Sequence, residues 1–204
     1  MQKNFFLAQN VIKALKKVTK KRTFNGVHEP YFIGREKKYL NKCISSNSVA
    51  SVGSYLNKFE KKLKDYVGTK NVICTINGTA SLHLALILSG IKSDEEVLMP
   101  SLNYIASANA TLYCNAIPHF VEIDEKTLGV DPKKLVNYLK STTIIRKKVC
   151  INKFSKKRIR ALICLHTFGH PAEIDKIKSV CKDFNIFLIE DAAEGLGSFY
   201  KKKH

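Results

Sequence analysis

The hydrophobic residues of the first third of the chain follow a helical period. In residues 10–21 apolar side chains recur every three or four positions and lysines take the opposite face, which predicts a basic amphipathic helix. Such a helix could touch a membrane or a partner, but the interpretation that we favour is a peripheral helix without a membrane role. Residues 23–34 contain two glycines and a proline and predict a connector. Helical spacing returns over residues 37–66, with a loop expected at 49–53.

After Gly68 the pattern changes, and short β-type runs alternate with helical ones. The predicted strands are residues 71–76, 96–99, 117–123, 161–165 and 186–190. The predicted helices are residues 79–88, 104–113, 132–139 and 173–184, and a basic stretch covers 146–160. This alternation predicts an α/β fold with a mostly parallel sheet and helices on both faces. Ligands of such sheets bind beyond the carboxyl ends of the strands, so those ends should carry the function.

Composition agrees with a globular protein. The chain has 204 residues, of which 45% are hydrophobic and 25% charged, a length for one large domain or two small ones. No apolar run reaches the roughly 18 residues that a membrane-spanning helix needs, and the first residues do not resemble a secretory signal. The six cysteines form no C-x-x-C pair. They are typical of reduced core residues, so we expect a cytoplasmic protein.

The charge balance is strongly basic. Thirty-five Lys and Arg against 17 Asp and Glu give a net charge of +18 and a pI near 9.7. A basic nucleic-acid-binding protein is therefore one alternative. Only five of these residues are Arg, however, and no helix-turn-helix, zinc-finger or RNP signature is present. We expect a lysine-rich solvated surface that attracts anionic small molecules, and no nucleic-acid partner.

The first informative strand end is the segment Asn-Gly-Thr-Ala-Ser at residues 77–81. A predicted buried strand turns here through Gly78 into an apolar helix. The free amides and the positive end of a helix dipole at such a place bind anions, and a phosphate would fit. An ordinary turn with an N-cap has the same sequence. The chain has neither a Walker loop nor G-x-G-x-x-G, which argues against NTP hydrolysis and dinucleotide binding.

Two further strand ends carry candidate ligand-binding side chains. Tyr104 lies at a strand-to-helix turn, where its ring could stack on a flat heteroaromatic ligand or be buried as a core tyrosine. Glu190 and Asp191 end the last predicted strand, and small residues follow them. Two carboxylates at such a place are costly unless a cationic group pairs with them. The strand end therefore favours a cationic partner.

The pattern Cys164-x-His166-x-x-x-His170 resembles part of a zinc site. A structural zinc needs four ligands, and no second ligand pair stands out in the sequence. We therefore predict no metal site.

Taken together, these segments resemble the DegT/DnrJ/StrS family of pyridoxal-phosphate (PLP) sugar aminotransferases. The resemblance rests on the segments at 77–81 and 100–104, on His-Thr-Phe-Gly-His-Pro at 166–171 and on Glu-Asp-Ala-Ala-Glu-Gly-Leu-Gly-Ser at 190–198. The segments at 28–34 and 49–53 are similar to a subgroup that makes legionaminic acid and bacillosamine-type sugars. The resemblance implies an N-terminal helical extension over 1–26 and, over 27–204, the N-terminal part of a fold type I PLP-binding large domain.

The resemblance also implies an activity and its partners. Members of the family form homodimers with the active site at the interface. They transfer an amino group, usually from glutamate, to a nucleotide-linked keto sugar, in the biosynthesis of amino sugars for surface polysaccharides. The same reaction, with PLP as cofactor, is the function that we expect of the intact protein.

Carried over residue by residue, the resemblance assigns roles to six residues of this sequence. Thr79 and Ala80 should donate backbone hydrogen bonds to the PLP phosphate, next to the turn at Gly78. The ring of Tyr104 should stack on the pyridine ring, and Asp191 should pair with the protonated ring nitrogen. Glu194 should lie near the ring hydroxyl. His166 and His170 should lie near the site, without an assigned role.

The chain differs from the family in one respect. The family's Schiff-base lysine lies well downstream of the Glu-Asp-Ala-Ala motif, and only 13 residues follow Asp191 here. We therefore expect a truncated large domain without the catalytic lysine, as an incomplete and inactive fragment that holds PLP weakly and without covalent capture. The alternative is a non-catalytic homologue that binds PLP or a nucleotide sugar.

Overall fold

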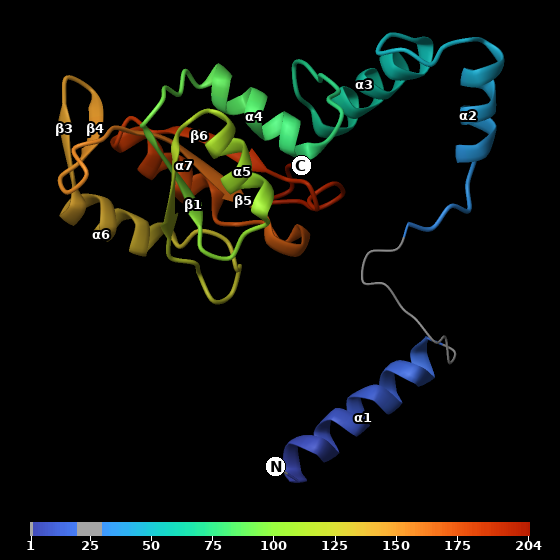
Figure 1. The fold of residues 1–204 in the computed structure, drawn as a ribbon, viewed down its shortest axis with the longest axis horizontal. Helices are drawn as coiled ribbons and strands as arrows, with labels where there is room; N and C mark the ends of the chain where they lie inside the picture. The colour runs from blue at the N-terminus through green and yellow to red at the C-terminus, as the bar shows by residue number, and fades with distance from the viewer. Residues whose placement is uncertain (1, 20–29) are drawn as a thin grey trace. The chain divides into compact units, whose positions relative to one another are not determined.

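The computed structural model describes residues 2–19 and 30–204, and the chain divides into two compact units, Met1–Asn57 and Lys58–His204 (Figure 1). The motif at 28–34 lies partly outside the described residues, and so does the boundary predicted between residues 26 and 27. That boundary stays a prediction. Within the described ranges, no helix is long and apolar enough to cross a bilayer.

The first unit is helical. Helix α1 covers Gln2–Val18, so it begins eight residues before the predicted start, because residues 2–9 contain no glycine or proline to stop a helix. Helix α2 covers Glu36–Ser45, and α3, Ser54–Val67, begins after the loop at 49–53 and continues into the second unit. The predicted interruption of the helical segment is therefore confirmed. Helix α2 buries none of its residues.

The second unit is built on a parallel four-stranded sheet in the order β2-β1-β5-β6. The strands are β1 (Glu96–Pro100), β2 (Ile117–Val121), β5 (Ile159–Leu165) and β6 (Phe187–Asp191). Strand β1 is buried along its whole length, and so is β5 except at Arg160, as expected for central strands covered on both faces. Four of the five predicted strands and the parallel α/β fold are confirmed.

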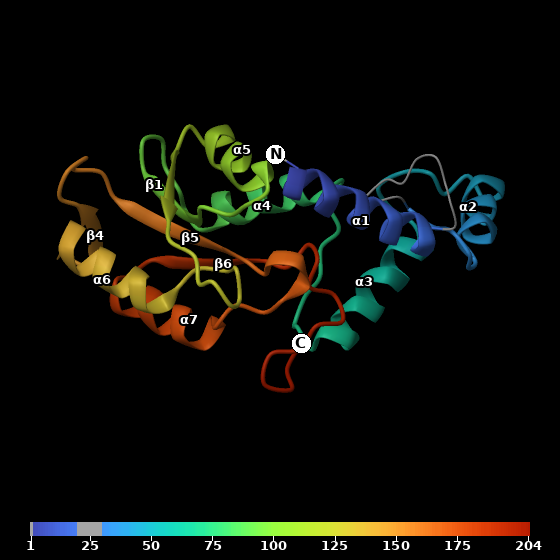
Figure 2. The same ribbon diagram turned by 90° about the horizontal axis from the view of Figure 1, so that it is seen from below.

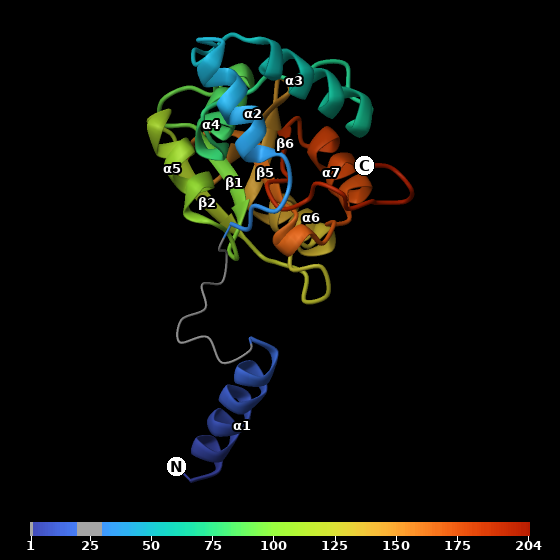
Figure 3. The same cartoon turned by 90° about the vertical axis from the view of Figure 1, so that its right-hand side faces the viewer.

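Helices cover both faces of this sheet (Figures 2 and 3). On one face, α4 (Gly78–Leu88) and α5 (Ile105–Tyr113) pack on Val97, Met99 and Ile189. On the other face, α6 (Pro132–Thr142) and α7 (Ile174–Asp183) pack on residues such as Leu162 and Leu188. Each helix returns the chain to the next strand's amino end, so α4 and α5 begin near the carboxyl edge of the sheet.

The predicted strand at residues 71–76 is wrong. This segment has no regular structure, and the side chains of Ile73 and Ile76 are 73% and 92% exposed. A strand needs a neighbour for its backbone hydrogen bonds. No described strand pairs with this one, and the N–H of Cys74 instead donates to the carboxylate of Glu60 at 2.9 Å.

The basic stretch contains a hairpin that the sequence pattern did not predict. Strands β3 (Thr143–Arg146) and β4 (Val149–Asn152) pair antiparallel. Lys147 and Lys148 form the turn, both with positive φ. Two-residue hairpins need such angles, which usually call for Asn or Gly. Two lysines carry no turn signal, so the sequence looked like a solvated basic run.

A buried carboxylate ties the hairpin to the amino edge of the sheet. Glu96 is only 4% exposed and accepts hydrogen bonds from His119 Nδ1 (2.7 Å), Asn152 Nδ2 (3.0 Å) and Ser155 Oγ (2.5 Å). Burial acts to raise the pKa of Glu96, but the hydrogen bonds from His119, Ser155 and Asn152 outweigh it and hold the pKa below its ordinary value. The charged carboxylate therefore stabilises the fold.

Glu96→Gln should lower the free energy of unfolding at pH 7 by about 1–3 kcal/mol, because the neutral amide loses the charge-assisted hydrogen bonds. Since the folded pKa is lowered, the unfolded state binds more protons, and the contribution of Glu96 is lost as the pH falls through its folded pKa. The difference between the two proteins should therefore shrink below about pH 4. Urea unfolding of both proteins, followed by circular dichroism at pH 7 and again below about pH 4, tests this. A difference that stays constant with pH would contradict it.

Candidate functional site

The start of α4 forms a helix N-terminus with a built-in cap. Asn77 is the N-cap, with extended backbone angles, and its side-chain Oδ1 accepts a hydrogen bond from the N–H of Ala80 at 2.9 Å. Ser81 Oγ lies 2.5 Å from Thr75 Oγ1. Asn77 was not among the predicted site residues, although Asn directly before Gly-Thr is a recognisable N-cap signal.

Two backbone N–H groups of this turn remain available. In the described part of the chain, no acceptor is recorded for the N–H of Gly78 or of Thr79, while that of Ala80 is taken by Asn77. A Cβ added to Gly78 would meet nothing within 4 Å. Open space in front of two unpaired amides at a positive helix end suits an anion such as a phosphate.

Tyr104 is an exposed aromatic residue at the edge of the sheet. It is the N-cap residue of α5, directly after the loop that follows β1, and 73% of its surface is exposed. The alternative of a buried core tyrosine is therefore excluded. The ring is free to stack on a flat ligand.

Asp191 ends β6 and faces the same side of the sheet as α4 and α5. Ile189 packs against the cluster that α4 and α5 cover, and side chains alternate along a strand, so Asp191 follows Ile189 onto that face. The residue is 9% exposed, and its Oδ1 accepts a hydrogen bond from the N–H of Ala193 at 3.2 Å. No partner for Oδ2 is recorded among the described residues. The start of α4, Tyr104 and Asp191 therefore share one face at the carboxyl edge.

Glu194 is occupied elsewhere in this structure. Its Oε2 accepts a hydrogen bond from the N–H of Phe168 at 2.8 Å, which ties the turn after β6 to the short 3-10 helix Thr167–Gly169 after β5. Phe168 has a positive φ of 55°, a conformation that costs energy for a bulky residue. The visible role of Glu194 is thus to hold this turn, and its predicted contact with a ring hydroxyl stays a prediction.

His166 and Glu190 form a pair on the opposite face. The N–H of Ala172 donates to Nδ1 of His166 at 3.2 Å, so Nε2 carries the proton and donates to Glu190 Oε2, also at 3.2 Å. His166 therefore fixes the ends of β5 and β6. The hydrogen-bond partner of Glu190 is thus a neutral histidine and not the cationic group that the sequence favoured, and this link was not predicted.

The zinc pattern does not assemble. Burial raises the pKa of the Cys164 thiol to about 12, whereas a zinc ligand must be a thiolate. His166 is held by Ala172 and Glu190, and His170 is exposed. No group of three or more His, Cys, Asp or Glu is placed to hold a metal in the ranges that the structure describes.

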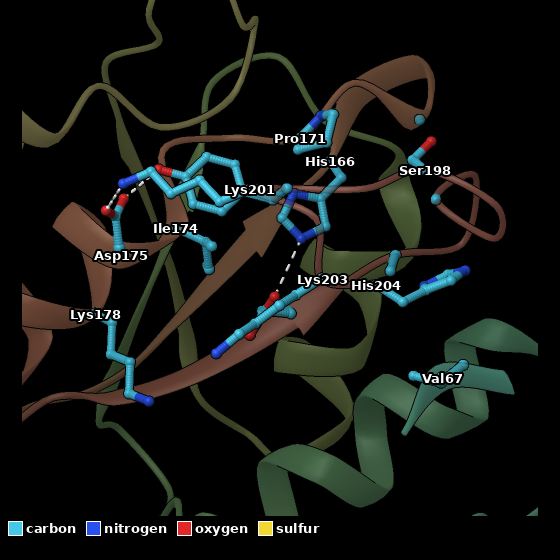
Figure 4. A pocket seen from close by; sticks show the side chains of 15 residues that line it. Val67, His166, Pro171, Ile174, Asp175, Lys178, Ser198, Lys201, Lys203 and His204 are labelled. Atoms are coloured by element: carbon cyan, nitrogen blue, oxygen red, sulfur yellow. Dashed lines mark hydrogen bonds and ion pairs between the residues drawn. The ribbon is translucent and has the colours of Figure 1, made fainter. Parts of the chain in front are cut away.

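A cavity of about 570 Å³ lies on the α7 face (Figure 4). The pair of His166 and Glu190 forms part of its wall, and Lys178 and Lys203 reach it from α7 and from the C-terminal segment. Lys201, also at its wall, pairs with Asp175 at 2.5 Å. Glu190 lines this cavity, whereas Asp191 and Tyr104 do not.

Comparison with known proteins identifies the family. Residues 31–204 match the DegT/DnrJ/EryC1/StrS aminotransferase family. The chain belongs to this family. The GDP-perosamine synthase of Escherichia coli O157:H7 is 37% identical over 178 residues, which are 87% of this chain and 44% of that protein. The chain therefore spans less than half the length of this curated relative.

Comparison with solved structures confirms the fold. The structure of DesI in the presence of its TDP-sugar product aligns with a TM-score of 0.70 at 25% identity, over 85% of this chain and 40% of DesI. The E. coli GDP-4-keto-6-deoxy-D-mannose-3-dehydratase with bound hydrated PLP gives a TM-score of 0.71 at 18% identity, over 89% and 44%, and shows the fold alone. The predicted fold type I large domain is confirmed over part of its length. The legionaminic acid and bacillosamine subgroup stays a prediction.

Proposed function

We propose that this chain binds PLP at the face shared by α4, Tyr104 and Asp191. We further propose that it serves the transfer of an amino group from glutamate to a nucleotide-linked keto sugar. Membership of the family supports the reaction class. The names of two relatives, GDP-perosamine synthase and DesI with its TDP-sugar product, support a nucleotide-linked sugar as substrate. The predicted homodimer and cytoplasmic location remain part of this proposal.

The residues present fit the cofactor. The N–H groups of Gly78 and Thr79 would hold the phosphate, the ring of Tyr104 would cover one face of the pyridine, and Asp191 would receive the ring N–H. The cofactor, when bound, supplies an electron sink for the carbanion formed at the amino-acid carbon. Asp191 would keep the ring nitrogen protonated, so the chain's own contribution would be to hold a charge at that atom.

The observation that carries the proposal is a set of three hydrogen-bonding groups on one face, each without a partner in the described part of the chain. Two amides at the start of α4 and one oxygen of the buried Asp191 have no recorded partner within the described residues. An anionic oxygen without a recorded partner and two unpaired amides on the same face of the sheet suit a ligand that carries both a cationic and an anionic group. A molecule with an anionic end, a flat ring and a cationic nitrogen would use all three.

Gly78→Pro should weaken the binding of pyridoxamine 5′-phosphate by roughly tenfold, because it removes one N–H from the phosphate site. Proline is tolerated at the first helical position, and Asn77 already has the extended backbone that proline requires of its predecessor. Gly78→Ala is the matched control, since it keeps the N–H while adding side-chain carbon at the same position as proline does, so any loss that the two variants share is steric. Isothermal titration measures both. Equal affinities of the two variants would contradict a phosphate site at this amide.

We also propose that the 204-residue polypeptide holds PLP without a covalent bond. Near the end of β6, Lys178 and Lys203 line the cavity on the α7 face, and Lys201 is paired with Asp175. Borohydride reduction followed by peptide mapping should therefore find only scattered, substoichiometric lysine adducts. A stoichiometric adduct at one lysine, lost in Asp191→Asn, would contradict this and identify an attachment residue.

A further inference from the structure

Helix α1 carries an unpartnered apolar face that the family does not explain. The family match begins at residue 31, after the end of α1 at Val18. The apolar side chains on this helix are nevertheless half exposed or more. They include Leu7, Val11, Ile12, Leu15 and Val18.

The apolar and charged residues of α1 are segregated around the helix. At about 100° per residue, Leu7, Val11, Leu15 and Ile12 fall within one half of the circumference. Lys13, Lys16 and Lys17 lie on the other half, and all three are exposed. The helix contains no acidic residue, and the sequence continues with Lys20, Lys21 and Arg22. One half of the surface is thus mostly apolar, and the other half carries the lysines together with Phe6 and the neutral Gln9 and Asn10.

We propose that α1 lies in the surface of an anionic lipid bilayer, with its apolar face inserted and its lysines at the lipid phosphates. An amphipathic helix of low net hydrophobicity, with lysines on its polar face, has the properties that interfacial binding requires. The inserted half is Leu, Ile and Val, and the cationic half complements a negatively charged surface. A membrane role for this helix departs from the prediction made from the sequence, which favoured a peripheral helix without a membrane role.

The same features argue against other occupants. Nucleic acid would use the lysines but leave half of the helix surface, which is apolar, in water. A second copy of α1 could pair through the apolar faces, but that packing leaves the lysines of both helices without an anionic partner. An anionic bilayer satisfies the apolar half and the lysines at once.

Vesicle co-sedimentation of the full chain tests this. We expect binding to vesicles of equal parts phosphatidylcholine and phosphatidylglycerol, weakened by salt, and little binding to phosphatidylcholine alone. Changing Lys13, Lys16 and Lys17 together to Gln should reduce the partition coefficient roughly a hundredfold. Ile12→Asn with Leu15→Asn should reduce it at least roughly tenfold. Both variants should keep the thermal unfolding of the sheet unit, which shows that the loss is local.

The matched control replaces three exposed lysines of another helix, Lys61, Lys62 and Lys64 of α3, with Gln. This variant has the same net charge as the α1 variant and should bind vesicles like the wild type. Equal loss in both triple variants would show that general basic charge drives binding and would overturn the proposal. So would equal binding to both vesicle types, or self-association in the absence of lipid that Leu15→Asn abolishes.

Discussion

Asp191→Asn should weaken the binding of pyridoxamine 5′-phosphate by roughly tenfold to a hundredfold. The carboxylate is buried at the end of β6, and it is the acidic group on the α4 and α5 face that can pair with a protonated ring nitrogen. A hydrogen bond between charged partners contributes about 1.5–3 kcal/mol, and the neutral amide of Asn loses that contribution. Isothermal titration measures the change. The amine form of the cofactor is used because its aldehyde would react with the many surface lysines.

The adjacent carboxylate provides the matched control. Glu190 has the same charge and lies one residue away, but it faces α7 and is hydrogen bonded to His166. Glu190→Gln should therefore leave the affinity within about twofold, since it is not part of the site. If Glu190→Gln were the variant that loses binding, the cofactor would sit on the α7 face.

Leu162→Ala should lower the free energy of unfolding by about 2–5 kcal/mol. Leu162 is fully buried in β5, a central strand, and packs in the cluster beneath α6 and α7. Truncation leaves a cavity in addition to the lost apolar contact. Urea unfolding followed by circular dichroism measures the change, because the chain has no tryptophan to serve as a fluorescent probe.

The same measurement tests the segment that the sequence suggested as a strand. Ile76→Ala should change the free energy of unfolding by no more than about 0.5 kcal/mol, because the side chain is almost wholly in water. A loss at Ile76 comparable to that at Leu162 would mean that residues 71–76 are packed in solution and that the described sheet lacks one of its strands.

The segments at 161–165 and 71–76 show which strands can be predicted from a sequence and which cannot. The runs at 161–165 and 71–76 look alike locally, since both are short, apolar and bounded by turns. Only the first has strand neighbours on both sides, and strand pairing is a property of the whole chain. The hairpin at Lys147 and Lys148 was missed for the opposite reason, because tertiary bonds to Glu96 hold a segment without turn residues.

The candidate site residues lie in segments whose local pattern is easier to interpret than that of their surroundings. Anion-binding helix starts and strand-end carboxylates are local features, so Gly78, Thr79 and Asp191 could be proposed as site residues from the sequence and the family resemblance. That Glu190 and Asp191 face opposite sides follows from the two-residue period of a strand. Which of them shares a face with α4 depends on the packing of Ile189, which only the structure shows. Only the structure shows, likewise, that the N–H of Ala80 is hydrogen bonded to the N-cap residue Asn77.

The most direct test of the central claim is a titration of the ¹⁵N-labelled chain with pyridoxamine 5′-phosphate, followed by amide chemical shifts in NMR spectra. The site proposed here predicts the largest shifts at Gly78, Thr79, Tyr104 and Asp191, saturating together with one affinity. Shifts centred instead on His166, Lys178 and Lys203, which line the cavity on the α7 face, would contradict it. So would the absence of any saturable shift at the start of α4.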